Sequence, residues 1–400
     1  MPKVSTRIQH MQASPIRKLA PYAQRAQDKG IHVHHLNIGQ PDIKTPREFF
    51  DAFKEFDEEV LKYSESQGLK ETIDSFVDYY SKWDINFENQ DILITNGGSE
   101  AILFAIMAVA DYGDNVVMPE PFYTNYNGFS ESAGVNVSPF LTTAENGFRL
   151  PSREVIEASI NSRTKAIVVS NPGNPTGVVY TRDEIELLCQ IAYDNDLFII
   201  TDEVYREFVY DGLKFTSFMH IKGYEDRIIL IDSISKRYSA CGARVGLVAS
   251  KNVDVIENIL KLCQSRLCVP TIEQFAVSKL INVDDSYFTE VKAEYEKRRN
   301  LVFTALSSID GVVCKKPTGA FYVIAKLPIE DGEDFIKWLL SDYSIDGQTV
   351  MMAPADGFYA TKGLGKNEVR ISYCLNCDNL KKAMHIIETG LKKYIELKSN

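Results

Sequence analysis

The sequence lacks an apolar run long enough to cross a bilayer, since the longest strongly apolar run, AILFAIMAVA at residues 101–110, is about half the length needed. It also lacks internal repeats, low-complexity tracts and long blocks of one charge. The formal net charge of −11 disfavours general nucleic-acid binding, because phosphates repel an acidic surface. The cysteines are few and odd in number, seven in 400 residues, which is typical of reduced thiols in a cytoplasmic protein. We therefore expect neither a membrane nor a nucleic acid as partner.

A second CxxC motif is also missing, so Cys374 and Cys377 have no companion pair and we expect no metal site. Residues 1–27 contain no acidic residue and five lysines or arginines. This composition loosely resembles an organellar transit peptide, but the segment has no apolar stretch of the kind found in secretory signals. We expect it to be part of the folded protein, for a reason given below.

The composition, with 44% hydrophobic and 25% charged residues, is that of an ordinary globular protein. The length suits two or three domains. Short apolar runs alternate with helical stretches from residue 91 onward. Strands are predicted at 91–95, 115–119, 135–140, 166–170, 198–202, 228–232 and 245–250. Helices are predicted at 99–113 and 181–196, with Ser99 and Thr181 at their N-caps. This pattern predicts an α/β fold with a mostly parallel sheet and helices on both faces.

The alternation of apolar runs and helical stretches ends near residue 285. A long charged helix follows and leads to two strand-like segments and two further helices. We expect a smaller α+β domain there, completed by the other end of the chain. The predicted domains are a large α/β domain at 46–285 and a small domain formed by 1–45 and 286–400. The charged run KAEYEKRR at 292–299 is expected to be a solvated face of the long helix.

Ligands of such sheets bind beyond the carboxyl ends of the strands. The run at 91–95 is followed by Asn-Gly-Gly-Ser-Glu, in which glycines permit close approach and a helix start can bind an anion. This segment matches neither the dinucleotide fingerprint nor the Walker pattern, and a simple turn would have a similar sequence. The loop NPGNPTG at 171–177 is rigid, and its Asn174 can project a fixed amide.

Charged and phenolic residues follow the later strands. Asp202 ends the run at 198–202, where a buried acid needs a partner, and Tyr205 is expected on the same side one turn later. Lys236 and Arg244 follow the run at 228–232, and Arg370 lies inside an apolar strand, where an unpaired guanidinium is costly. A surface lysine or an Asp helix cap explains some of these residues one at a time. Together they suit an anionic ligand with an aromatic nitrogen and a carbonyl, and pyridoxal phosphate has these properties.

Five blocks of the sequence, in order, resemble those of one family. They are LNIGQPDIKTP (36–46), NPGNPTG (171–177), TDEVY (201–205), SISKRYSACGARVG (233–246) and EVRISYCL (368–375). The chain is identified as a member of the class I/II aminotransferases of the fold-type I pyridoxal-phosphate superfamily, similar to aspartate aminotransferases. The resemblance covers essentially the whole chain and includes SPIRKLAPYAQ at 14–24, which is why we expect the N-terminal segment to be folded.

The resemblance implies the roles of the residues around the cofactor ring. Lys236 would form a Schiff base with pyridoxal phosphate and then move the α-proton of the substrate. Asp202 would hold the pyridine nitrogen protonated. Asn174 and Tyr205 would donate to the phenolic oxygen of the ring, and Tyr123 would stack on its face.

The resemblance also implies a phosphate site, a substrate site and a partner subunit. The phosphate would be bound by Gly98, Ser99, the backbone N–H of Glu100, Ser233 and Arg244. Arg370 would clamp the α-carboxylate of the substrate, assisted by the backbone N–H of Gly39 and by Asn174. Tyr63 matches a tyrosine that reaches the phosphate of the neighbouring subunit, which implies a homodimer with composite active sites.

The implied activity is a ping-pong transfer of an amino group between an L-amino acid and 2-oxoglutarate, with aspartate favoured as the donor. The alternatives are an alanine or aromatic amino acid aminotransferase, or a pyridoxal-phosphate-dependent lyase, decarboxylase or cyclopropane-forming synthase of the same fold. A regulator without catalysis is disfavoured, because Lys236 and Asp202 are present. One aspartate-preferring branch has a lysine after the Gly-Gly pair, where this chain has Ser99. A cation for a second carboxylate must therefore come from elsewhere, and Arg266 and Arg17 are the candidates.

Overall fold

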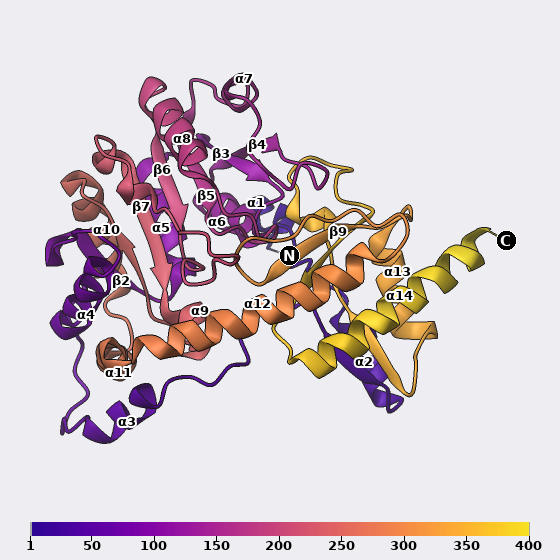
Figure 1. The fold of residues 1–400 in the computed structure, drawn as a ribbon. Helices are drawn as coiled ribbons and strands as arrows, with labels where there is room; N and C mark the ends of the chain where they lie inside the picture. The colour runs from indigo at the N-terminus through magenta and orange to yellow at the C-terminus, as the bar shows by residue number, and fades with distance from the viewer. Residues whose placement is uncertain (1, 400) are drawn as a thin grey trace.

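A seven-stranded sheet forms the centre of the computed structural model, which describes residues 2–399 (Figure 1). The strand order is β2-β8-β7-β6-β5-β3-β4. The strands are β2 (Ile92–Thr95), β3 (Asn115–Glu120), β4 (Asn136–Leu141), β5 (Thr164–Ser170), β6 (Phe198–Asp202), β7 (Ile228–Ser233) and β8 (Gly246–Ala249). Strand β8 runs antiparallel to both neighbours, whereas β7, β6, β5, β3 and β4 pair in parallel. The predicted α/β class and mostly parallel sheet are confirmed.

Both faces of this sheet are covered by helices, which explains why its strands are continuously apolar. One face packs against α5 (Gly98–Val109), α6 (Asn125–Ala133) and α10 (Val253–Arg266). The other packs against α3 (Arg47–Glu55), α4 (Lys70–Ser81), α7 (Arg153–Glu157), α8 (Arg182–Asp194) and α11 (Thr271–Ser278). Neighbouring strand residues divide between the two cores, as Ile199 and Ile200 do. No helix within residues 2–399 combines the length and the apolar character that a membrane span requires.

Two smaller sheets lie in the part of the fold built from the chain ends. Strands β11 (Ala353–Pro354), β12 (Glu368–Ser372) and β9 (Tyr322–Lys326) form an antiparallel sheet, and β1 (His32–His35) pairs in parallel with β10 (Gln348–Met351). The helices of this part are α2 (Ala20–Asp28), α12 (Asp285–Ser307), α13 (Gly332–Asp342) and α14 (Cys377–Ser399), whereas α1 (Thr6–His10) contacts α6. Helix α12 runs from beside the central sheet into this part, where it packs along α14 (Figure 1).

A hydrophobic core shared by both chain ends supports the expected domain division. It contains residues from 19–36 and from 291–394, together with Val204, Tyr205, Phe208 and Tyr210 of the central segment. We propose on this basis that 46–285 is the large domain and that 1–45 and 286–400 form the small one.

The start of α5 differs from the expectation. The helix begins at Gly98 after Gly97, whose φ is 75°, so Ser99 is its second residue and not its N-cap. This left-handed backbone is the reason that glycine is needed at 97, and a Cβ there would also lie 2.5 Å from a nitrogen of Arg244. The expected cap at Thr181 is present, because its hydroxyl accepts a hydrogen bond from the Glu184 N–H.

The prediction of a solvated charged face at 292–299 was wrong for its last two residues. Arg298 and Arg299 are buried. Arg299 donates to both carboxylate oxygens of Asp211 at 2.9 Å, and Arg298 pairs with Asp42 at 2.5 Å and with Glu294 at 2.8 Å. Both charges are buried because they are paired, and sequence separation conceals Asp211 and Asp42 as partners.

Candidate active site

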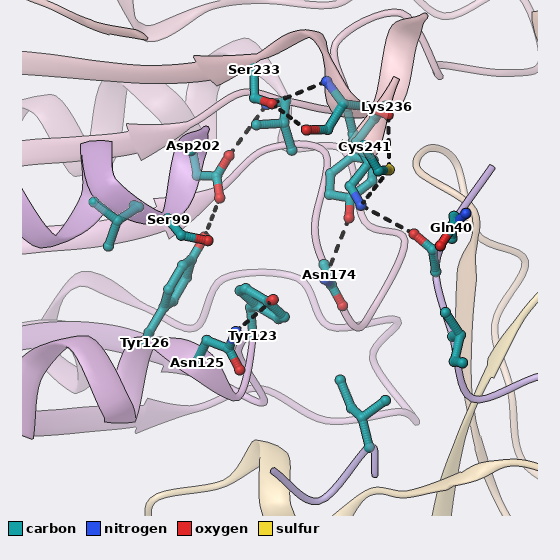
Figure 2. Close-up of a pocket in the computed structure, with 18 of the residues that line it drawn as sticks. Gln40, Ser99, Tyr123, Asn125, Tyr126, Asn174, Asp202, Ser233, Lys236 and Cys241 are labelled. Carbon is teal, nitrogen blue, oxygen red and sulfur yellow. Dashed lines mark hydrogen bonds between the residues drawn. The ribbon is translucent and has the colours of Figure 1, made fainter. Parts of the chain in front are cut away.

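A pocket of about 410 Å³ lies where β5, β6 and β7 end and where the central sheet meets the small antiparallel sheet (Figure 2). Most of the predicted site residues line it. They are Gly39, Gly98, Ser99, Tyr123, Asn174, Asp202, Tyr205, Ser233, Lys236, Arg244 and Arg370. The fold therefore gathers residues that are more than 300 positions apart in the chain, as Gly39 and Arg370 are.

Lys236 supplies the primary amine of the pocket. It lies in the short helix α9 (Ile234–Arg237), directly after β7, and its side chain is half-buried. Its Nζ donates to the carbonyl oxygen of Gly39 at 3.1 Å and lies 3.9 Å from the sulfur of Cys241. No carboxylate of the described residues pairs with this amine. The nitrogen is therefore free to react with a carbonyl compound.

Asp202 supplies a buried carboxylate at the end of β6 (Figure 2). The Tyr126 hydroxyl donates to its Oδ2 at 2.6 Å, and the Val204 N–H donates to its Oδ1 at 3.3 Å. Burial raises the pKa of Asp202 to about 6, although these hydrogen bonds and the charge of Lys236 favour the ionised form. At neutral pH this carboxylate is a fixed negative charge that suits a protonated ring nitrogen.

The first turn of α5 has the properties of an anion site. Gly98 and Ser99 line the pocket at the N-terminus of this helix, where backbone N–H groups have no helical acceptor. The Ser99 hydroxyl forms no hydrogen bond with any residue of 2–399. The Ser233 hydroxyl, from the end of β7, accepts from the N–H of Ser235 at 3.0 Å and bonds its hydroxyl at 2.7 Å. These donors converge on one end of the pocket.

Arg244 adds a cation at the same end. Its backbone is left-handed, with φ 55°, and its guanidinium donates to the carbonyl oxygens of Cys241 and Asn96 at 3.1 and 3.2 Å. Within residues 2–399 no carboxylate neutralises it. An unneutralised guanidinium beside a helix N-terminus fits a phosphate ester.

Arg370 lies at the other end, on β12, where it is 1% exposed. Its Nη1 donates to Asn174 Oδ1 at 3.1 Å and its Nη2 to the Asn37 carbonyl at 2.5 Å, while Nε has no partner. Its guanidinium carbon lies 4.6 Å from the ring centre of Tyr322. Burial lowers the pKa of Arg370, because no carboxylate offsets the desolvation. A substrate carboxylate would supply the missing negative charge.

Two further phenols complete the walls. The Asn174 amide nitrogen lies 3.5 Å from the Tyr205 hydroxyl, which shares a hydrogen bond of 2.9 Å with the Tyr322 hydroxyl. Burial raises the pKa of Tyr205, so this phenol stays neutral and able to donate. The Tyr123 hydroxyl accepts from the Asn125 amide at 2.8 Å. Tyr205 follows Asp202 through a non-helical turn, and not the helical turn that its spacing suggested.

Several residues of the pocket were not identified from the sequence. They include Gln40, Asn125, Tyr126, Ser235, Cys241 and Tyr322. Tyr126 bonds Asp202 from 76 positions away, and Tyr322 bonds Tyr205 from 117 positions away. The one available indication for Tyr126 was its place three residues after Tyr123, a spacing that a single turn brings together.

Three predicted residues lie outside this pocket in the single chain. The Glu100 carboxylate accepts from the Asn96 N–H at 2.8 Å and pairs with Arg266 Nε at 3.3 Å. Arg266 also donates to the Ile94 carbonyl at 3.1 Å, so its guanidinium is already engaged. Tyr63 is 78% exposed. Arg17, the other candidate for a distal cation, does line the pocket.

The pocket thus fits pyridoxal phosphate at three separate points. The amine of Lys236, the buried carboxylate of Asp202 and the guanidinium of Arg244 lie around one space. Within residues 2–399 no carboxylate neutralises that guanidinium. When bound, this cofactor supplies an aldehyde for an amine and a ring that withdraws electrons from the substrate α-carbon. The fold and the pocket define the protein as a pyridoxal-phosphate-dependent enzyme of fold type I.

Comparisons with known proteins identify the family within this class. Residues 31–387 match the family model of aminotransferase class I and II, and the chain belongs to this family. It is 32% identical to an aspartate aminotransferase of Thermotoga maritima over 97% of this chain and 99% of that protein. It is 31% identical to aromatic-amino-acid aminotransferase 2 of Thermococcus litoralis over 98% of each chain. The solved structure of an alanine aminotransferase from Pyrococcus furiosus superposes with a TM-score of 0.89 at 28% identity, covering 98% of this chain and 100% of that one.

Proposed function

We propose that this aminotransferase moves an amino group between aspartate and 2-oxoglutarate by a ping-pong mechanism. The single observation that favours a dicarboxylic substrate is a second cation on the wall of the pocket. Arg17 lines the same pocket as Arg370, its side chain is exposed, and it has no ion pair within the described residues. Two arginines that face one pocket can bind the two carboxylates of one small substrate.

Residues of this chain would divide the chemistry as follows. Arg370 binds the α-carboxylate and so fixes which bond of the α-carbon faces Lys236. Lys236 removes the α-proton and returns it at the neighbouring position, a step that needs its amine uncharged. Asp202 keeps a negative charge beside the ring nitrogen, and Tyr205 with Asn174 donates hydrogen bonds to the ring oxygen. Support for this division comes from the contacts of Arg370 and Asp202 and from the free amine.

The charge of Arg17 reaches the interior of the pocket. Burial raises the pKa of Tyr123, and the positive charges of Arg370 and Arg17 both act to lower it. Tyr123 therefore lies within the field of both guanidinium groups. Arg266, by contrast, is held by Glu100 and the Ile94 carbonyl and does not line the pocket. We therefore assign the distal carboxylate to Arg17 and not to Arg266.

Replacing Arg17 by alanine should lower kcat/KM for aspartate by at least about tenfold, or ~1.4 kcal/mol, because the distal carboxylate loses its cation. Activity with alanine, which has no distal carboxylate, should change less than about threefold. The matched control is Arg266→Ala, which removes a guanidinium outside the pocket. Initial rates with aspartate, glutamate and alanine provide the test. Equal losses for aspartate and alanine, or a wild-type enzyme that prefers alanine, would contradict the proposal.

An aromatic amino acid is the second candidate donor. Ile16, Ile38, Ile102 and Phe129 also line the pocket and give it an apolar side. Such a surface can accept a ring as readily as an aliphatic chain. The same substrate screen separates the two candidates, because an aromatic donor would be used equally well by the wild type and by Arg17→Ala.

We also propose a homodimer in which Tyr63 reaches the cofactor phosphate of the other subunit. In the single chain, Tyr63 lies next to further exposed apolar side chains, with Val60 60% and Leu61 61% exposed. Several exposed apolar side chains so close together are typical of an interface between subunits. Its phenol also lies outside the pocket of its own chain.

Complementation tests this sharing of sites. A Lys236→Ala protomer mixed with a Tyr63→Ala protomer should form heterodimers that have one site with both changes and one intact site. At limiting cofactor, mixing should restore about a quarter of wild-type activity, because half of the randomly paired dimers have one intact site of two. Subunit exchange is verified by mass spectrometry of differently tagged chains. Proven exchange without recovery would show that Tyr63 acts within its own subunit.

A further inference from the structure

Asn37 is a buried polar residue beside the pocket that the chemistry described above does not use. It directly follows the end of β1 and Leu36, is 2% exposed and does not line the pocket. The Leu36 N–H donates to the Met351 carbonyl at 2.8 Å, and the Leu36 carbonyl accepts from the Ser372 N–H at 2.8 Å. Asn37 is therefore held on a rigid frame at the ends of β10 and β12, because backbone hydrogen bonds fix the residue before it.

The side-chain amide of Asn37 binds the segment that carries Arg17. Its Nδ2 donates to the backbone carbonyl of Ile16 at 2.9 Å, whereas its Oδ1 has no hydrogen-bond partner within residues 2–399. Ile16 and Arg17 lie in a turn, in which the N–H groups of Arg17 and Lys18 both donate to the Ser14 carbonyl at 3.1 Å. The amide thus fixes the backbone from which the Arg17 side chain reaches the wall of the pocket.

The backbone carbonyl of the same residue binds the other arginine of the pocket. Nη2 of Arg370 donates to the Asn37 carbonyl at 2.5 Å, which is shorter than its 3.1 Å bond from Nη1 to Asn174. A backbone carbonyl and a side-chain amide of one residue are only a few covalent bonds apart. The supports of both guanidinium groups therefore meet at one residue.

Other contacts also hold the segment that carries Arg17, but they are less directional. Pro15 packs against Gly357, where a Cβ would lie 2.3 Å from the proline ring. Lys18 pairs with Glu333, and the lysine is exposed, so water weakens this pair. The hydrogen bond from Asn37 is the buried and directional contact, and we expect it to set the orientation of the segment.

We propose that Asn37 is a positioning residue for dicarboxylic substrates, which sets the place of Arg17 relative to Arg370. This inference rests on the proposed function, in which the two arginines bind the two carboxylates of aspartate. Guanidinium groups bind carboxylates best through two parallel N–H donors, so a small displacement of Arg17 weakens the distal contact. The contact with the α-carboxylate persists, because it depends on Arg370.

Replacing Asn37 by alanine separates these two contacts, since it removes the amide and keeps the carbonyl that Arg370 uses. We expect kcat/KM for the half-reaction with aspartate, divided by that with alanine, to fall by at least about fivefold, because alanine has no distal carboxylate. The fall should appear as weaker binding of aspartate, with the rate at saturation nearly retained. Rapid mixing of the holoenzyme with each amino acid measures both quantities.

Trypsin supplies a readout that does not depend on catalysis. It cleaves after Arg17 and Lys18, which are both exposed, and a segment released from its anchor is cut more readily. Cleavage at these two bonds, followed by mass analysis, should be at least about fivefold faster in Asn37→Ala. The matched control is Asn115→Ala, because Asn115 is also buried and donates through its amide, at 2.9 Å to Thr164, but lies outside the pocket. It should change the substrate ratio and this cleavage by less than about twofold.

A double variant tests whether Asn37 acts through Arg17. In an Arg17→Ala background, Asn37→Ala should change the substrate ratio by less than about twofold, because the guanidinium that it positions is already absent. A larger further fall there, or a fall of less than about fivefold in Asn37→Ala alone, would overturn the role of Asn37. A lower ratio without faster cleavage would also overturn it, since Asn37 would then act through Arg370.

The failure of the proposed function gives a different result. If Arg17→Ala alone leaves the ratio of aspartate to alanine unchanged, the distal carboxylate is not bound by Arg17, and both the proposed function and this inference are wrong. If Arg17→Ala lowers the ratio and Asn37→Ala does not, this inference alone is wrong. Asn37→Ser, whose hydroxyl lies one bond closer to the backbone than the amide nitrogen does, tests the same expectations if the alanine variant is unstable.

Discussion

Replacing Lys236 by alanine should reduce turnover by at least about a thousandfold and leave the cofactor without a covalent bond to the chain. The reason is that Lys236 is the lysine that lines the pocket, so no second amine within the described residues can replace it. Its Nζ has a carbonyl oxygen and a thiol as neighbours and pairs with no carboxylate of residues 2–399. The protein should still bind the cofactor, because the anion site at Arg244 is unchanged.

Two measurements check this result. Single-turnover kinetics with glutamate report the chemical step, and borohydride reduction followed by peptide mass analysis reports the covalent attachment. Lys222→Ala is the control, because the side chain of Lys222 is 82% exposed and lies outside the pocket. Covalent attachment that persists in Lys236→Ala would mean that a different amine holds the cofactor.

Replacing Asp202 by asparagine should slow the half-reaction by about a hundredfold or more, while cofactor binding persists. The amide has nearly the same shape and can still accept the hydrogen bond from Tyr126. It has no negative charge, however, and cannot hold a proton on the ring nitrogen. Because burial raises the pKa of Asp202 only to about 6, the native side chain is ionised at neutral pH and the substitution removes a full charge there.

Rapid mixing with glutamate measures this half-reaction directly. Glu203→Gln is the matched control, because Glu203 is also a buried acid, adjacent in sequence, but pairs with Arg206 and does not line the pocket. Its loss should lower the melting temperature and alter the half-reaction less than about threefold. If the half-reaction of Asp202→Asn slowed by less than about tenfold, or ~1.4 kcal/mol, the charge would not have the proposed role.

The sequence predicted the fold class and about half of the residues that line the pocket. Buried parallel strands must be apolar on both faces, so the runs at 166–170 and 198–202 are recognisable from their residue types alone. Ligands of such sheets bind beyond the ends of the strands, and Asp202 at the end of one run and Lys236 shortly after another do line the pocket. The apolar runs pointed to these residues, and the family resemblance supplied their expected roles.

Hydrogen-bond partners that are distant in the sequence could not be predicted in the same way. Tyr126 and Tyr322 are ordinary aromatic residues in their own segments, and only the packed fold brings them to Asp202 and Tyr205. The choice between Arg17 and Arg266 was also open, because both are isolated arginines in the sequence. Folding pairs Arg266 with Glu100 and leaves Arg17 on the wall of the pocket.

What the sequence determined by itself was therefore the seven strands of the central sheet, the family, and the residues whose chemistry is set by short motifs. The tertiary structure decided which charges are neutralised and which remain available, as Arg298 and Arg299 show by being buried and paired within a run that the sequence presents as solvated. The physical reason is that the free energy of a charge depends on its distance to other charges and to water. Those distances join residues far apart in the chain, such as Arg298 and Asp42, and exist only once the chain has folded.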